Sequence, residues 1–173
     1  MKKSLTLGLL TLLSSTLAAP LSSVYTPLEF GKCKVVSRNP EGDGSAVDLC
    51  PGVAGYALVL EEGDLRQNLQ VIFPNRKKYS LELWTFISSG FSSTGPRAEW
   101  RMSGKVPKAL IVRFNASENS EDSSKITSYL AVAKIGSSGA CLVAKIQPGV
   151  NMNLEARRIS DRASTMKCLT APQ

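Results

Sequence analysis

The chain has 173 residues, with 21 Lys and Arg against 14 Asp and Glu, four cysteines and no histidine. The missing imidazole excludes Ser-His-Asp and Cys-His catalysis, because both need a histidine base. Without histidine or a Cys-x-x-Cys motif the usual zinc ligands are also absent, so we predict no metal and no cofactor.

The amino-terminal residues have the layout of a secretory signal peptide. Two lysines follow the first Met, residues 5–17 are apolar and uncharged, and two alanines come next. This apolar stretch is too short for a membrane-spanning helix, which needs roughly 20 residues, and no later stretch reaches that length. We predict a signal peptide over residues 1–18, one strand-rich globular domain over residues 19–173, and a periplasmic or secreted protein without a membrane span.

The predicted mature chain is mildly basic, with 19 Lys and Arg against 14 acids. This charge favours solubility and weak attraction to anionic polymers such as envelope lipids. The basic residues are scattered, and the one run of three, Arg76–Lys78, lies in a predicted turn. Aromatic residues are not interleaved with them, as single-strand nucleic-acid binders need, so no nucleic-acid partner is predicted.

The first predicted element is a hairpin. Residues 33–37 and 46–50 flank a segment rich in Pro, Asn and Gly. A hairpin symmetric about that turn places Cys33 opposite Cys50, at a separation that suits a disulfide. An even number of cysteines behind an export signal favours disulfides, although four cysteines allow three pairings.

Further strands are predicted at residues 56–61, 65–73, 99–102, 109–114, 129–135 and 141–146, because each is rich in β-branched, aliphatic or aromatic residues. Tyr79, Leu81 and Leu83 alternate in the same way. Residues 88–96 are predicted to be a loop, and the polar residues 115–125 a mobile connection.

The carboxyl-terminal part changes period. Apolar residues at steps of three and four predict a helix over residues 151–164 that docks on the sheet, with Glu155, Arg158, Asp161 and Arg162 pointing away. The lengths of strand and helix bring Cys168 back beside Cys141. The predicted fold is α+β, with a mainly antiparallel, curved sheet, one carboxyl-terminal helix and two disulfides.

Two charged segments are the best candidates for a site. Asp64 and Arg66, and likewise Glu99 and Arg101, lie two apart and therefore on one face of a strand, with Trp100 beside the second pair. The alternative interpretation is a surface network of ion pairs beside a core tryptophan.

Short segments along most of the mature chain resemble a group of uncharacterised exported bacterial proteins. The segments are Tyr25-Thr26 with Leu28, Gly55-Tyr56, Glu62-Gly63-Asp64-Leu65-Arg66, Glu99-Trp100-Arg101, Gly139-Ala140-Cys141 with Val143-Ala144, and Asn153-Leu154 with Ala156-Arg157. That group often has histidine after the third cysteine, where this chain has Leu142. The resemblance implies export and a shared fold but no activity.

The sequence thus favours an exported, non-enzymatic binding module with an unknown envelope or extracellular partner and an unknown oligomeric state. Its binding residues would be Asp64, Arg66, Glu99, Trp100 and Arg101. The alternative is a hydrolase of cell-wall or other polysaccharides that uses two carboxylates, with Asp64 and Glu99 as candidates.

Overall fold

The computed structural model describes residues 21–29, 31–39, 41–42 and 44–171, so the predicted signal peptide lies outside the described residues. The strands are β1 (Ser22–Pro27), β2 (Lys34–Arg38), β3 (Ala46–Pro51), β4 (Ala57–Gly63), β5 (Arg66–Ile72), β6 (Lys78–Ser80), β7 (Phe91–Ser103), β8 (Val106–Ser117), β9 (Ile126–Gly136) and β10 (Gly139–Ile146). The helices are α1 (Leu83–Phe86), α2 (Met152–Asp161) and the 3₁₀-helix η1 (Ala163–Thr165).

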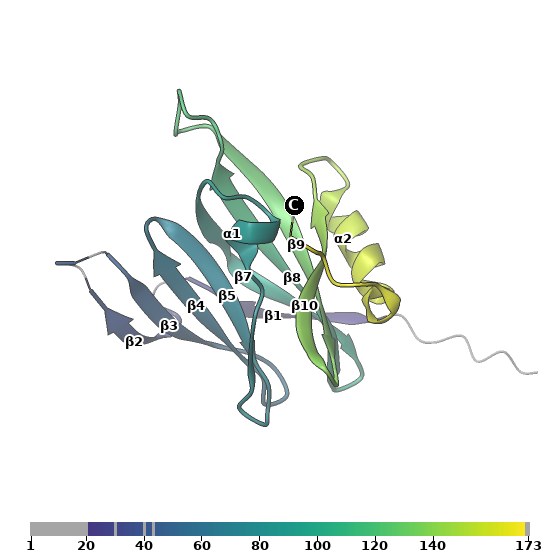
Figure 1. Ribbon diagram of the computed structural model, residues 1–173. Helices are drawn as coiled ribbons and strands as arrows, with labels where there is room; N and C mark the ends of the chain where they lie inside the picture. Colours follow the sequence, from purple (N-terminus) through teal and green to yellow (C-terminus); the bar gives the residue numbers. More distant parts are fainter. Residues whose placement is uncertain (1–20, 30, 40, 43, 172–173) are drawn as a thin grey trace, which may run out of the picture.

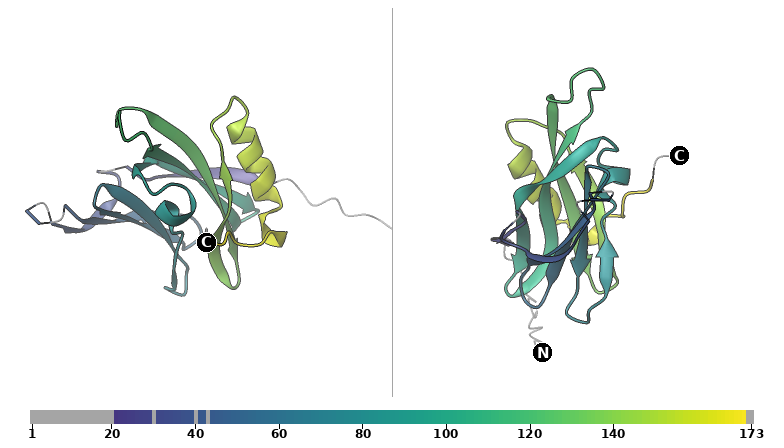
Figure 2. Two further views of the ribbon diagram at one scale, coloured as in Figure 1. Left: turned by 45° about the horizontal axis from the view of Figure 1, so that its top comes forward. Right: turned by 90° about the vertical axis from the view of Figure 1, so that its left-hand side faces the viewer.

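The strands form one mixed, open sheet in the order β10-β9-β8-β7-β5-β4-β3-β2, with β1 added to β7 and β6 added to β5. The described strand pairs are antiparallel except for the contact of β5 with β7, where Arg66 lies beside Ser92 in parallel orientation. The sheet bends sharply, and the β2–β3 hairpin and α2 lie at its opposite ends (Figures 1 and 2). The predicted mainly antiparallel, curved sheet broadly fits this arrangement, while the short helix α1 was not predicted.

The long strand β7 joins the two halves of the sheet. Its first residues lie beside β5, and its last residues pair with β1 from Ser22↔Met102 to Pro27↔Arg97. Along its second half the side chains alternate, so that Ala98, Trp100 and Met102 are buried in the main core. Their neighbours on the strand point to the opposite face of the sheet.

Two hydrophobic clusters stabilise the fold on the two faces of the β7–β10 half. The larger cluster lies between the two halves and contains Trp100 and Phe114, both fully buried, together with leucines of β4 and β5. The smaller cluster lies between the outer face of β8–β10 and the two terminal helices, where Ala156 of α2 and Ala163 of η1 are buried. The apolar stripe predicted for the terminal helix therefore docks on the sheet.

Both predicted disulfides are present. Cys33 and Cys50 have Cα atoms 4.3 Å apart, and Cys141 and Cys168 have Cα atoms 5.7 Å apart. The first pair continues the β2–β3 ladder by one residue beyond Lys34↔Leu49, which is the symmetry that the sequence suggested. The second forms because α2 and η1 return the chain to β10, where the Leu169 amide donates to the Leu142 carbonyl at 2.8 Å.

Several predicted boundaries are wrong. Residues 88–96 are not a loop throughout, because β7 begins at Phe91 and passes through Gly95 and Pro96 as a bulge between Thr94 and Ala98. The alternation after Tyr79 is not a strand, since Leu83 begins α1.

No helix in the part of the chain that the structure describes is both long and apolar enough to cross a membrane. The same residues contain no group of three or more Cys, Asp or Glu side chains that could hold a metal ion.

Candidate functional site: an arginine cavity between the sheet and α2

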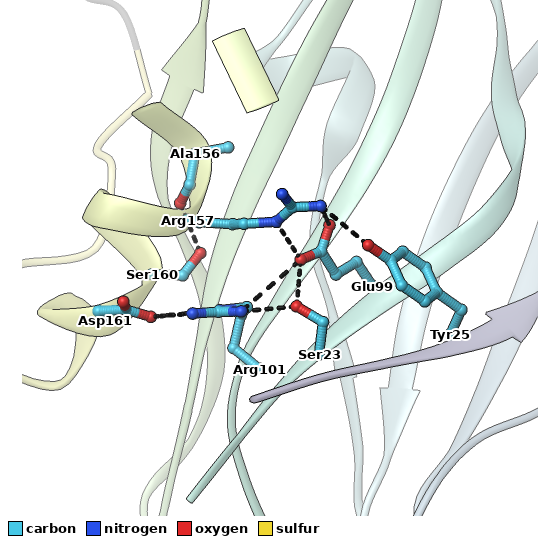
Figure 3. Close-up of polar contacts among 8 residues, drawn as sticks. All are labelled: Ser23, Tyr25, Glu99, Arg101, Ala156, Arg157, Ser160 and Asp161. Carbon is cyan, nitrogen blue, oxygen red and sulfur yellow. Dashed lines mark hydrogen bonds and ion pairs between the residues drawn. The ribbon is translucent and has the colours of Figure 1, made fainter. Parts of the chain in front are cut away.

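The structure divides the five candidate residues among three places. Glu99 and Arg101 lie on the outer face of β7 and meet α2, as Figure 3 shows. Trp100 points to the opposite face, is fully buried, and donates from its indole nitrogen to Thr26 Oγ1 at 2.9 Å. Asp64 and Arg66 lie at a different end of the sheet, in and after the turn between β4 and β5.

The Glu99 carboxylate is the centre of a polar network between α2, β7 and β1 (Figure 3). Arg157 of α2 donates from Nε to Glu99 Oε1 at 2.7 Å and from Nη2 to Oε2 at 3.2 Å. Ser23 of β1 donates to Oε1 at 2.5 Å, and Arg101 Nη1 lies 3.8 Å from the same oxygen. Tyr25 accepts a further hydrogen bond from Arg157.

These contacts determine the charge on Glu99. Burial alone would raise the pKa of the Glu99 carboxyl, but the hydrogen bonds from Arg157 and Ser23 outweigh it and hold the pKa below its usual value. The pKa of Arg157 is raised by its hydrogen bond to Glu99. Glu99 is therefore an anion at neutral pH and has no proton to donate as a general acid.

Arg101 is fixed on its other side by α2. Its Nε and Nη2 donate to Asp161 Oδ1 at 3.2 and 2.7 Å, and its side chain is 8 % exposed. The prediction that Asp161 points away from the sheet is therefore wrong. Asp161 lies on the side of α2 that faces β7, because Asn153, Arg157 and Asp161 are spaced by four and share that side.

Beside this network lies a cavity of about 530 Å³, which we call the arginine cavity. It opens between α2, the end of β1 and the bulged part of β7 and β8. Its lining comprises Tyr25, Gly95, Pro96, Arg97, Glu99, Ile111, Arg113, Leu130, Asn153 and Arg157. Three guanidinium groups thus face one carboxylate.

Two of the three arginines have no acidic partner among the residues that the structure describes. Arg113 donates to Ser128 Oγ at 2.8 Å and contacts the Met152 sulfur, and the Arg97 guanidinium lies 5.7 Å from the centre of the Tyr25 ring. Neither contact neutralises the positive charge. The arrangement can accept a carboxylate or phosphate group, which guanidinium donors bind through paired hydrogen bonds.

The β7 bulge makes the space for Arg113. Thr94 pairs with Phe114 and Ala98 with Val112, so three residues of β7 lie opposite Arg113 alone. A Cβ atom on Gly95 would lie 2.8 Å from the Arg113 Cβ atom, closer than such contacts allow. Glycine at this position therefore permits the close approach of β7 to the Arg113 side chain.

The sequence did not single out Arg97, Arg113, Arg157, Tyr25 or Ser23 as site residues. The spacing of Asn153, Arg157 and Asp161 is a signal on α2 that could have drawn attention to a polar side next to the apolar stripe. The β1 residues gave no such signal, because a strand over Ser22–Pro27 was not predicted.

The two carboxylates proposed for a hydrolase do not converge. Asp64 pairs with Arg66, and Glu99 pairs with Arg157 and Arg101. Arg66 lies beside Ser92, and Glu99 follows Ser92 by seven residues along β7, which corresponds to about 20 Å of extended strand. Glycosidase carboxylates lie about 5–10 Å apart.

No family model, no curated protein and no solved structure matches the chain. The resemblance to exported bacterial proteins thus stays an expectation from the sequence.

Proposed function

We propose that the chain is an exported, non-enzymatic binding module, and that its arginine cavity binds the anionic group of an envelope or extracellular molecule. The observation that carries the proposal is the pair Arg97 and Arg113, which face the cavity without an acidic partner among the described residues. Arg157 adds a third guanidinium that Glu99 holds in place.

Export is supported by the two disulfides, since such bonds form and persist in oxidising compartments. A non-enzymatic role is supported by the chemistry of the cavity. Its one carboxylate, Glu99, is held as an anion by hydrogen bonds, and the chain has no histidine that could act as a base near neutral pH.

The proposal is tested with two kinds of anionic probe and the oxidised mature protein. Isothermal titration calorimetry with pyrophosphate and with citrate measures binding of soluble anions, and co-sedimentation compares phosphatidylglycerol vesicles with phosphatidylcholine vesicles. Binding of the soluble anions would indicate a small ligand or a soluble polymer. Binding confined to the phosphatidylglycerol vesicles would indicate a lipid headgroup.

A double variant, Arg97→Gln with Arg113→Gln, identifies the site. Each lost charge-assisted hydrogen bond contributes about 1.5–3 kcal/mol, so the loss of two should lower the affinity about 100-fold or more. The matched control, Arg76→Gln with Lys77→Gln, removes the same charge from the exposed β5–β6 turn and should change the affinity by about twofold at most at physiological salt. Equal losses in both variants, or no binding of any probe, would refute the proposal.

A further inference from the structure

A second cavity, of about 1010 Å³, lies at the end of the sheet that holds Asp64 and Arg66. We call it the aromatic cavity, and its lining includes Asp64, Arg66, Trp84, Phe86, Ser89 and Lys145. A smaller hollow of about 430 Å³, lined by Phe91 and Asn119 among others, shares Arg66 and two serines with it. Segments from different parts of the chain therefore build one continuous concave surface: the β4–β5 turn, the stretch from α1 to the start of β7, the end of β8 with the residues that follow it, and Lys145 of β10.

Large apolar side chains are exposed around this surface. Leu65 is 64 % exposed, Phe91 47 % and Trp84 36 %. The Arg66 guanidinium lies 5.2 Å from the centre of the Phe91 ring. Tryptophan is seldom this accessible in a folded domain, and aromatic side chains are enriched at binding surfaces.

The backbone that presents these side chains is strained. Asp64 and Leu65 have φ angles of 50° and 57°, and Glu82, which directly precedes α1, has a φ angle of 51°. Glycine is the favoured residue at such positions, and the left-handed conformation is costly for leucine. Strain of this kind concentrates at functional sites, where the surrounding structure enforces it.

The surrounding structure does enforce it here. The Ser92 amide donates to the Leu65 carbonyl at 2.9 Å, and the Leu83 amide donates to the buried Asn68 side chain at 3.0 Å. At the carboxyl end of α1, Lys145 donates to the Ile87 carbonyl. Trp84 is therefore held on a fixed platform before any ligand arrives, which lowers the entropic cost of binding.

This surface has two acidic and two basic side chains, and each of them already contacts another side chain. Its acidic residues are Asp64 and Glu118, and its basic residues are Arg66 and Lys145. Arg66 pairs with Asp64, and Glu118 accepts from Tyr129, over whose ring Lys145 lies at 4.0 Å. The remaining polar side chains of the lining are neutral and carry hydroxyl or amide groups: Thr85, Ser88, Ser89, Ser117, Asn119, Ser120 and Ser123.

We infer that the aromatic cavity binds a neutral carbohydrate, with one pyranose ring packed on Trp84 and its hydroxyl groups bonded to the serine and amide rim. An aromatic face suits the C–H face of a sugar ring, while the hydroxyl and amide groups suit the sugar hydroxyls. A purely apolar peptide or acyl chain would leave that rim without partners, which is costly. The cavity is large enough for a short oligosaccharide. This binding is independent of the arginine cavity, because the two linings share no residue.

The test is a titration of the oxidised mature protein with cellotriose, maltotriose and triacetylchitotriose, followed by NMR. The chain has two indole N–H groups, and the buried Trp100 serves as an internal control for Trp84. We expect at least one trisaccharide to shift the Trp84 indole signal and the Arg66 and Ser89 amide signals while the Trp100 signal stays in place.

Variants then test whether the sugar ring packs on Trp84. Trp84→Ala should weaken binding about tenfold or more, Trp84→Phe should retain part of it, and Val106→Ala, which trims an exposed valine elsewhere, should leave it unchanged. The inference is overturned if no trisaccharide shifts these signals at about 10 mM, which corresponds to negligible affinity. It is also overturned if Trp84→Ala binds the trisaccharide as tightly as the parent does. Displacement of the trisaccharide by detergents with dodecyl chains would overturn it as well, because such a chain makes none of the hydroxyl contacts of a sugar.

Discussion

Replacing Glu99 by glutamine tests whether the network between α2 and β7 stabilises the fold through its charge. The amide keeps the shape of the side chain but removes the charge that Arg157 and Arg101 share. The Glu99 side chain is 12 % exposed, whereas the Arg157 side chain is 40 % exposed, so solvent screens part of the interaction. A buried charged hydrogen bond contributes about 1.5–3 kcal/mol, and with this screening we expect a loss of about 2 kcal/mol in the free energy of unfolding at pH 7.

The pH dependence of this loss separates charge from shape. Since the pKa of Glu99 is lowered in the folded state from the reference value of 4.5, its contribution is fully present above that value and disappears as the pH falls through the folded-state pKa. The difference in stability between the parent and Glu99→Gln should therefore be constant from neutral pH down to about pH 5 and shrink below pH 4.5.

Urea denaturation of the disulfide-intact proteins, followed by circular dichroism at a series of pH values, measures this difference. Glu121→Gln is the matched control, because Glu121 lies exposed in the β8–β9 connection, and it should change stability by less than about 0.5 kcal/mol. A Glu99→Gln protein as stable as the parent at pH 7, or one whose deficit does not change with pH, would refute the account of the network.

Three further perturbations follow from the structure. Gly95→Ala should lower the free energy of unfolding by about 1–3 kcal/mol, because the added methyl group overpacks against Arg113. The same variant should weaken anion binding in the calorimetric titration, because Arg113 moves. If neither value changes, β7 can shift freely at this position. Replacing Cys141 and Cys168 together by alanine should cost about 3.5 kcal/mol, from the 27-residue separation of the bridged residues, and urea denaturation that detects no loss would contradict it. Leu65→Gly should stabilise the domain by about 0.5–1 kcal/mol, since glycine adopts the positive φ angle without strain, and a destabilised variant would show that the Leu65 side chain contributes packing that its exposure hides.

The elements that the sequence predicted correctly are those whose signals are local. The Cys33–Cys50 pair followed from the symmetry of a single hairpin, and the Cys141–Cys168 pair followed from the lengths of one strand and one helix. The inward position of Trp100 agrees with the core-tryptophan interpretation, and it follows from the period of two along β7. These inferences needed no knowledge of how distant segments pack.

The elements that were missed depend on tertiary context. The start of β7 is rich in serine and glycine and by itself favours a loop, yet hydrogen bonds from both neighbouring strands hold it extended. The partner of Arg101 on α2 could not be deduced, because the docking angle of the helix decides whether Asp161 faces the sheet. Asp64 and Glu99 looked equivalent as charged residues, although the sheet holds them at different ends.

Both proposed sites lie where the β7 ladder is irregular, and this has a physical basis. A regular sheet covers its faces with side chains at even spacing and leaves little concave surface. At its start β7 has a single paired residue, Ser92, with β5, and the neighbouring Phe91 is exposed beside the aromatic cavity. At the bulge around Gly95 and Pro96 the β7–β8 pairing opens beside the arginine cavity. Bulges and changes of partner redirect side chains and leave space between elements. The same strand thus provides an aromatic surface without net charge at one irregularity and a positively charged surface at the other. The experiments on these two surfaces therefore test chemically different ligands.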